Sequence, residues 1–208
     1  MNVLIIDDHA LIREGIALMI KTLRPDASVW QASSYSGGME IADSEHIDFT
    51  FLDLQLPDGS GFNALERIKR QHELMSVVVV SAHEDRPTVM RALEMGAKAF
   101  VPKSANTERM RHVVEDLLDG RVYLPESVLG PEAPGDEGEE AWNLTERQKE
   151  VLSLLILGLS NKMIARKLNI VESTVKIHVS AILRELKVAS RTQAMLAVAR
   201  QGMKLPFC

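Results

Sequence analysis

Three aspartates stand where their carboxylates could act together on a cation and a phosphoryl group. Asp7 and Asp8 follow the apolar run at residues 3–6, and Asp53 follows the apolar run at residues 49–52. If both runs are parallel strands of one open α/β sheet, their carboxyl ends meet at one crevice. Like charges at that range raise each other's pKa unless a cation offsets them. Hard oxygen ligands with open positions suit Mg²⁺, so the spacing predicts a magnesium site.

Two further residues extend this acidic site toward phosphate chemistry. Ser81 follows the apolar run at residues 77–80, and Lys103 follows the run at residues 99–101 after Pro102. A hydroxyl and an ammonium group that face a metal-bound carboxylate form a clamp for phosphate oxygens. Any one of these acids alone could be a solvated loop residue, but five placements on matching strand ends favour phosphoryl transfer.

A second candidate site lies on a predicted helix at about residues 172–186. Its core stripe at 3.6-residue spacing consists of Val175, Val179, Ile182 and Leu186. The opposite face carries polar, basic and small side chains, namely Ser173, Lys176, Ile177, Ser180 and Arg184. Such a face fits the major groove of DNA, although the same pattern is typical of an ordinary solvated helix.

The distribution of charge separates the two candidate sites. Residues 1–120 have a net charge of -7 and residues 121–140 a net charge of -5, whereas residues 141–208 have a net charge of +7. A basic module behind an acidic one indicates a polyanionic partner such as nucleic acid. Chance clustering of solvated charges is the alternative that charge alone leaves open.

The elements that must position the acidic site alternate along residues 1–120. Short apolar strands are predicted at residues 3–6, 28–32, 49–52, 77–80 and 99–101. Helices are predicted between and after them at residues 11–23, 37–44, 62–71, 87–95 and 107–118. Continuous apolar strands fit a parallel sheet that is covered on both faces. With right-handed crossovers this order predicts a doubly wound five-stranded α/β domain.

The remainder of the chain reads as a linker and a small all-α domain. Residues 121–141 are rich in proline, glycine and acidic residues, which predicts a linker. Residues 142–208 predict four helices, at about residues 146–157, 161–168, 172–186 and 191–201. Thr145 and Gln148 fit a capping box at the first of them. Two short helices joined by a tight turn on a basic module suggest a helix-turn-helix.

Cysteine content and hydropathy restrict the class of protein further. The single cysteine, Cys208, cannot form an intrachain disulfide. The first apolar run is too short for a signal peptide, and no apolar run approaches the ~18 residues of a membrane span. We therefore expect an intracellular protein that makes no membrane contact.

Residues 1–120 resemble the receiver domain of bacterial two-component response regulators, which has a flavodoxin-like fold. The segments IIDDHALIREG, FLDLQLPDGSGF, VVVVSAHED and GAKAFVPKS match it in order and spacing. The resemblance implies that Asp53 accepts a phosphoryl group from a sensor histidine kinase or a small phosphodonor and loses it slowly. It implies Mg²⁺ bound by Asp8, Asp53 and the Gln55 carbonyl, with Asp7 acting mainly through water.

The same resemblance assigns roles to further residues of the receiver. Ser81 and Lys103 would bind the phosphoryl oxygens. Phe100, three residues before the lysine, would be the switch aromatic that turns inward when Ser81 moves toward the phosphate. Pro102 suggests a cis peptide that supports the lysine.

Residues 142–200 resemble the LuxR-type helix-turn-helix output domain, so the whole chain is similar to the NarL/FixJ family of response regulators. The resemblance implies Lys162 on DNA phosphates, Lys176, Ile177 and Ser180 toward base edges, and a last helix that pairs two copies. It implies a cytoplasmic transcription regulator that dimerises on promoter DNA. Val171 departs from the family by standing where a capping serine or threonine is usual, so Ser173 is an alternative cap.

Three other functions are compatible with part of the pattern. An aspartyl-phosphate phosphatase usually has a second acid two residues after the nucleophile, where this chain has Gln55. A quorum-type LuxR protein would have a small-molecule pocket. The acidic triad and Lys103 argue against this class of protein. A pseudo-receiver that ignores phosphate would lack some of the chemical residues, and all are present here.

Overall fold

The computed structural model describes residues 1–119, 121, 123 and 142–200. Most of the predicted linker at residues 121–141 and the last eight residues therefore lie outside the described residues. The chain divides into two compact units, Met1–Glu115 and Asp116–Cys208. The first unit is built from alternating strands and helices, and the second is helical.

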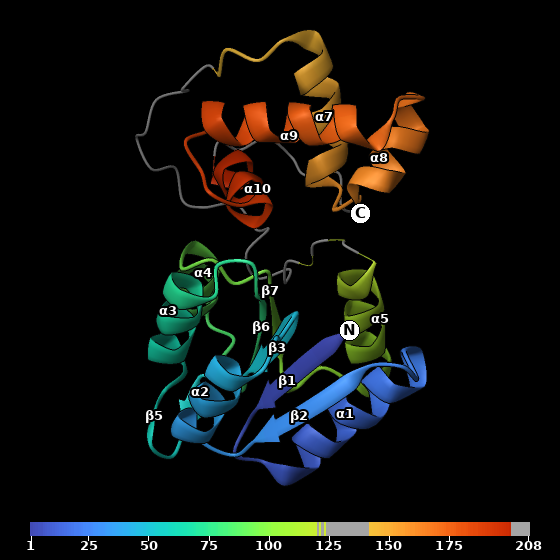
Figure 1. Ribbon diagram of the computed structural model, residues 1–208. Helices are drawn as coiled ribbons and strands as arrows, with labels where there is room; N and C mark the ends of the chain where they lie inside the picture. Colours follow the sequence, from blue (N-terminus) through green and yellow to red (C-terminus); the bar gives the residue numbers. More distant parts are fainter. Residues whose placement is uncertain (120, 122, 124–141, 201–208) are drawn as a thin grey trace. The chain divides into compact units, whose positions relative to one another are not determined.

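A five-stranded sheet forms the centre of the first unit (Figure 1). Its strands lie in the order β2-β1-β3-β6-β7, and every neighbouring pair is parallel. They are β1 (Asn2–Ile6), β2 (Ser28–Ala32), β3 (Phe49–Leu52), β6 (Ser76–Ser81) and β7 (Ala99–Pro102). The predicted doubly wound sheet is confirmed. Its strand order reverses between β1 and β3, which is where sheets of this kind bind ligands.

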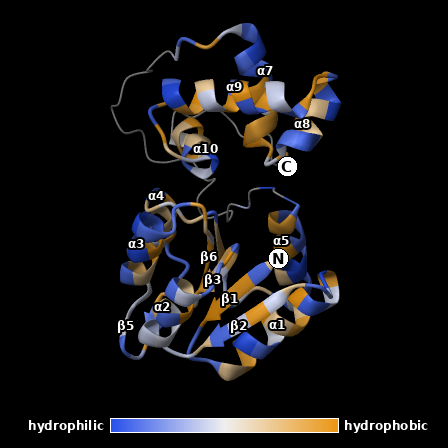
Figure 2. Ribbon diagram, viewed as in Figure 1, coloured by the Kyte–Doolittle hydropathy of each residue, from blue (hydrophilic) through white to orange (hydrophobic). Residues whose placement is uncertain are grey.

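Five helices cover the sheet: α1 (Ala10–Leu23), α2 (Tyr35–Ser44), α3 (Gly61–Gln71), α4 (Arg86–Glu94) and α5 (Thr107–Leu118). Helices α1 and α5 lie on one face, and α2, α3 and α4 lie on the other (Figure 1). This double cover explains the continuous apolar strands, because side chains on both faces of β1 and β6 are buried. Figure 2 shows the hydrophobic colour concentrated on the central strands and on the sheet-facing sides of the helices.

Four helices of the first unit begin one or two residues earlier than their hydrophobic spacing predicts, and polar side chains cap the first turns of α2, α3 and α4. At α2 the Ser34 hydroxyl accepts a hydrogen bond from the Gly37 amide at 3.2 Å. At α4 the Asp85 carboxylate accepts one from the Thr88 amide at 3.0 Å. Each cap satisfies an amide that has no partner inside the helix and so extends the helix toward its N-terminus.

A short antiparallel hairpin follows β3 and was not predicted from the sequence. Its strands are β4 (Gln55–Leu56) and β5 (Gly59–Ser60), which pair Gln55 with Ser60 and Leu56 with Gly59. Strands of two residues are too short to show a hydrophobic period, so pattern analysis cannot detect them. The hairpin carries the chain from the end of β3 to the start of α3.

The second unit contains α7 (Glu146–Ile156), α8 (Asn161–Leu168), α9 (Glu172–Glu185) and α10 (Arg191–Arg200). The predicted capping box at Thr145 and Gln148 is confirmed. Helix α8 ends at Asn169, whose left-handed φ of 52° turns the chain into α9. The four predicted helices are present, and their buried side chains include Val151, Leu155, Ile164, Val175, Ile182, Ala194 and Val198.

A half-buried arginine connects the last helix to the start of α8. The Arg191 guanidinium donates hydrogen bonds to the Asn161 side-chain oxygen at 3.2 Å and to the Leu159 carbonyl. Burial lowers the pKa of Arg191 to about 10.

Among the helices that the structure describes, none combines the length and the apolar character that crossing a membrane requires.

Candidate functional site

The ends of β1, β3 and β7 bring three predicted site residues together. Because β1 pairs with β3, with Ile6 opposite Leu52, Asp7 and Asp53 leave the sheet side by side. The Asp53 amide continues this ladder by donating to the Ile6 carbonyl at 2.8 Å. Ligand atoms of Asp7, Asp8, His9 and Asp53 all lie within 4.8 Å of one another. The spacing argument thus placed the acidic cluster correctly.

Lys103 reaches into this cluster from the end of β7. Its Nζ lies 2.7 Å from Asp53 Oδ2 and 2.8 Å from Asp7 Oδ2, and its side chain is only 10% exposed. Its amide donates to the Ser81 carbonyl at 2.8 Å, which extends the pairing of β6 with β7 by one residue. The ammonium group therefore offsets two buried carboxylates that the sheet forces together.

Burial and the ammonium group act in opposite directions on the pKa of the Asp53 carboxylate. Burial raises the pKa of Asp53 above its ordinary value, although the hydrogen bonds from Lys103 and from the Gln55 amide oppose the rise. Burial alone would lower the pKa of Lys103, but its hydrogen bond to Asp53 and the nearby Asp7 raise it overall. Lys103 therefore stays protonated at neutral pH and offsets the charge on Asp53.

The acidic pair at the end of β1 is not symmetric. Asp7 is 2% exposed, and its Oδ1 accepts a hydrogen bond from the His9 amide at 2.8 Å. Its buried Oδ2 forms an ion pair with Lys103 Nζ at 2.8 Å. Asp8 is exposed, and its Oδ1 lies 2.5 Å from His9 Nδ1. The carboxylate oxygens of Asp7, Asp8 and Asp53 lie within 4.8 Å of one another, and this donor set fits a hard divalent cation such as Mg²⁺.

The remaining predicted receiver residues, Ser81, Gln55 and Phe100, differ in their burial and in their hydrogen bonds. Ser81 is fully buried, and its hydroxyl accepts from the His83 amide at 3.2 Å. The Gln55 amide donates to Asp53 Oδ1 at 3.1 Å. Phe100 has no exposed surface, so its ring is in the inward position.

The expected cis peptide around Pro102 is wrong, since no cis peptide bond occurs among the described residues. Pro102 is the last residue of β7, in register with Ser81. The strand thus carries Lys103 to Asp53 in an extended, trans conformation, and no cis bond is needed to direct the lysine.

The segment from Asp53 to the first residue of α3 contains two positioning residues that the sequence argument missed, Asp58 and Gly61. The Asp58 carboxylate accepts hydrogen bonds from the amides of Tyr35 and Ser36 and from the Ser36 hydroxyl, at 2.6, 2.9 and 2.6 Å. The hydroxyl and amide of Ser36 keep the pKa of Asp58 below its ordinary value. A Cβ atom at Gly61 would lie 2.1 Å from the Asp53 carbonyl oxygen. The signal was present in the sequence as DGSG, but only the fold shows what it contacts.

We expect Gly61→Ala to displace the backbone of Asp53, because the new methyl group would also lie 2.5 Å from Leu54 Cα. Phosphorylation by acetyl phosphate should slow strongly, and the midpoint of thermal unfolding should fall. The matched control is Gly15→Ala in α1, where a Cβ meets no atom within 4 Å and alanine favours the helix. Equal labelling of Gly61→Ala and Gly15→Ala would contradict this role.

The predicted DNA-facing side of α9 is exposed as expected. Ser173, Lys176, Ile177, Ser180 and Arg184 are all exposed, with Ile177 at 69%. Val175, Ile182 and Leu186 are buried, and Val179 is half-buried at the edge of the core stripe. The helical period therefore assigned both faces correctly.

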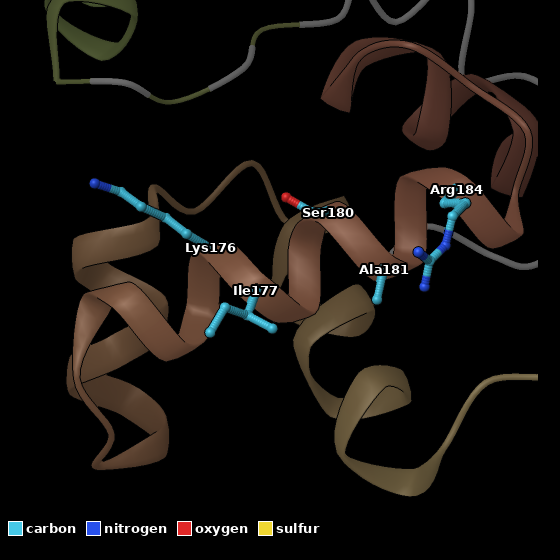
Figure 3. Close-up of a pocket in the computed structure, with 5 residues that line it drawn as sticks. All are labelled: Lys176, Ile177, Ser180, Ala181 and Arg184. Atoms are coloured by element: carbon cyan, nitrogen blue, oxygen red, sulfur yellow. The ribbon is translucent and has the colours of Figure 1, made fainter.

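A shallow hollow runs along this face of α9. Figure 3 shows the five side chains that line it, Lys176, Ile177, Ser180, Ala181 and Arg184. Ala181 was not predicted, and its small side chain leaves room between its neighbours. Ser173 lies outside the hollow. The combination of two cations, a hydroxyl and an apolar side chain suits base edges, phosphates and thymine methyl groups.

The turn before this helix and the preceding helix complete the surface. Lys162 is exposed near the start of α8. Val171 is the N-cap of α9, and no side chain caps it, so the alternative of a Ser173 cap is wrong. Lys176 forms an exposed ion pair with Glu172 at 3.4 Å. Exposed pairs of this kind contribute little, so Lys176 is available to another anion.

Comparisons with known protein families divide the chain as the geometry does. Residues 3–115 match the family model of the response regulator receiver domain. Residues 142–198 match that of bacterial regulatory proteins of the luxR family. The two matches coincide with the acidic cluster and with the exposed face of α9.

Curated relatives and solved structures agree with these matches. The glycerol metabolism activator of Pseudomonas putida is 35% identical over 94% of each chain. The nitrate/nitrite response regulator protein NarL of Escherichia coli K12 is 33% identical, over 95% of this chain and 94% of its own. A structure of the Salmonella typhimurium response regulator RcsB has a TM-score of 0.56 at 21% identity, covering 94% of this chain and 96% of its own. At that identity the likeness shows the fold alone.

Proposed function

The chain belongs to the two-component response regulators that join a receiver domain to a LuxR-type DNA-binding domain, and on this premise we propose how its residues act. Asp53 accepts a phosphoryl group from a sensor histidine kinase, and α9 binds promoter DNA. The observation that carries this proposal is the contact of Lys103 with both Asp53 and Asp7 at the reversal of strand order. We propose domain limits of residues 1–120, 121–141 and 142–208.

The phosphoryl transfer needs little from the chain beyond position and charge. An Asp53 carboxylate oxygen forms a bond to phosphorus while the bond from phosphorus to the donor breaks, so the donor leaves with its electron pair. Lys103 then offers its ammonium group, and Ser81 its hydroxyl, to the phosphoryl oxygens. Asp7, Asp8, Asp53 and the Gln55 carbonyl would hold Mg²⁺, which supplies positive charge against the negative charge of the transferring group.

The proposed switch starts from the same residues. Ser81 is buried at the end of β6, and Phe100 is buried on the neighbouring strand β7, opposite Val79. A Ser81 hydroxyl that moves toward a phosphoryl group changes the space beside Phe100 and biases the surface of α4, β7 and α5. We propose that this surface, or α10, then pairs two copies on DNA. We propose that the protein acts in the cytoplasm, on promoter DNA.

The test of the proposed function is the effect of phosphorylation on DNA binding. We expect treatment of the full chain with acetyl phosphate and Mg²⁺ to tighten binding to a site selected from random DNA. Fluorescence anisotropy measures the dissociation constant, and mass spectrometry measures the phosphorylated fraction in the same sample. An unchanged dissociation constant in a fully phosphorylated sample would show that the receiver does not control α9.

Two exposed side chains flank the path of a water that would hydrolyse the phosphoryl group. Gln55 and His83 lie two residues beyond Asp53 and Ser81, and both side chains are exposed. We expect Gln55→Ala combined with His83→Ala to change the dephosphorylation rate several-fold, because these groups orient or screen the water. Phosphate release from the labelled chain gives the rate. A matched pair of alanine substitutions at exposed Gln31 and His46 should leave it unchanged.

A further inference from the structure

We propose that Ile177 and Ala181 of α9 form a binding site for the C5-methyl group of a pyrimidine in DNA. The chain then recognises thymine by its methyl group and accepts 5-methylcytosine in the same place. This inference rests on the proposed binding of DNA by α9. It names the chemical group that the apolar part of this surface recognises, which we call the methyl site.

The side chains that line the hollow of α9 form two rows along the helix. Residues that are four positions apart lie on the same side of a helix. Lys176, Ser180 and Arg184 therefore form one row, and Ile177 and Ala181 form the other. Figure 3 shows Ile177 and Ala181 on one side of the ribbon, and Lys176 and Ser180 on the other. The first row carries two cations and a hydroxyl, whereas the second is entirely apolar.

The apolar row is exposed although the domain core does not need it. Ile177 is 69% exposed, while Val175 and Ile182 on the same helix have no exposed surface and supply the packing. Ala181 is half-buried, and its single methyl group leaves space beside Ile177. An exposed aliphatic side chain by itself carries no meaning. Its place in a hollow with two cations gives Ile177 one, because the face that must approach a polyanion then includes an apolar contact.

The major groove of DNA offers an apolar side chain one kind of partner. Its base edges present hydrogen-bond donors and acceptors, and the apolar group among them is the C5-methyl group of thymine. Cytosine carries a hydrogen atom at this position, and methylation of cytosine at C5 places the same methyl group there. The side chain of Ile177 neither donates nor accepts a hydrogen bond, so a polar base edge against it would lose its bond to water without a replacement. The contact therefore favours a methyl group over the other groups in the groove.

The charges around the hollow indicate DNA as the partner rather than an apolar protein surface. None of the five residues that line the hollow is acidic, and Lys176 and Arg184 are basic. Residues 141–208 carry a net charge of +7. Double-stranded RNA does not fit, because its major groove is too narrow for side chains to read and its uracil bases have no methyl group.

Replacement of thymine by deoxyuridine tests the methyl site, because it removes one methyl group and keeps every hydrogen-bonding group of the base pair. The DNA is the site selected from random sequences, with each thymine replaced in turn, and fluorescence anisotropy gives the dissociation constant of the full chain. At the thymine that faces Ile177, deoxyuridine should weaken binding about fourfold, which corresponds to ~0.8 kcal/mol for one buried carbon group. Cytosine at that position should also weaken binding, and 5-methylcytosine should bind about fourfold more tightly than cytosine.

The variant Ile177→Ala connects this effect to the methyl site. It should bind the thymine and deoxyuridine sites equally and gain nothing from 5-methylcytosine. Lys176→Ala should keep the fourfold effect of the methyl group, because Lys176 belongs to the other row. Leu74→Ala is the matched control, since it shortens a side chain that is 97% exposed in the first unit. This control should also keep the fourfold effect.

Two results would overturn the proposal. One is a selected site at which no single deoxyuridine weakens binding of the wild type. The other is an undiminished methyl effect in Ile177→Ala whose circular dichroism matches that of the wild type. Failure of the full chain to bind any DNA sequence would instead reject the proposed function of α9, and the methyl site with it.

Discussion

Asp53→Asn will abolish uptake of a phosphoryl group from acetyl phosphate. The substitution keeps the size of the side chain but removes the nucleophilic carboxylate oxygen that faces Lys103 at 2.7 Å. An amide oxygen in that place is a poor nucleophile and gives Lys103 no charge to offset. Intact mass spectrometry after incubation with acetyl phosphate and Mg²⁺ should find one added phosphoryl group on the wild type and none on the variant.

Two controls separate this result from unfolding and from labelling elsewhere. Asp26→Asn, at an exposed aspartate in the turn after α1, should be labelled like the wild type. The far-ultraviolet circular dichroism of Asp53→Asn should match that of the wild type, and its stability should not fall. Burial raises the pKa of Asp53, which shows that the fold disfavours this charge. Undiminished labelling of folded Asp53→Asn would reject Asp53 as the acceptor.

Lys176→Ala will weaken binding to the preferred DNA site by about 1–3 kcal/mol and relax base preference there. Lys176 lies in the hollow of α9, and its ammonium group can reach base edges when that face enters a major groove. Loss of a base contact removes discrimination as well as affinity. Dissociation constants should therefore be measured for the selected site and for each single-base variant of it.

Lys162→Ala provides the contrasting result on the same domain. A phosphate contact carries no base information, so this variant should weaken all DNA sequences alike and reduce the salt slope by about one. Lys149→Ala on α7 is the matched control, since that lysine is exposed and paired with a glutamate on its own helix as Lys176 is. Unaltered base preference in Lys176→Ala would show that α9 does not read the site.

Much of the receiver site could be predicted because its residues sit at strand ends. Short, mostly hydrophobic runs locate β1, β3 and β6, and the topology of a parallel sheet then brings Asp7 and Asp53 together. Strand pairing converts positions far apart in the sequence into neighbours at one edge. The inference needed only the period of the strands and the direction of the chain.

The side-chain details at that edge could not be predicted in the same way. The contact of His9 with Asp8 depends on a rotamer and on the turn into α1, neither of which hydrophobic spacing records. The close approach of Gly61 to the Asp53 carbonyl depends on a loop with no period at all. The position of the Phe100 ring likewise depends on packing in a core whose residue types alone do not fix it.

In the second unit, the sequence predicts most of the candidate site, because hydrophobic spacing alone identifies the exposed face of α9. A 3.6-residue period separated the buried Val175 and Ile182 from the exposed Lys176 and Ile177 without any tertiary information. Ala181 was missed because a small side chain beside the core stripe has no distinguishing pattern. Its part in the hollow is visible only when the neighbouring side chains are seen together.

The hydrogen bonds of Asp58 to the first turn of α2 have a kinetic consequence for the acceptor loop. They anchor the far end of the segment that starts at Asp53, while the Asp53 amide anchors the near end on Ile6. Because this segment is held at both ends, the entropic cost of ordering it is met when the chain folds. The cost does not arise again each time a donor binds. A phosphodonor would therefore meet the proposed acceptor, Asp53, already ordered, and we expect release of the anchor at Asp58 to slow the bimolecular step without removing any reacting atom.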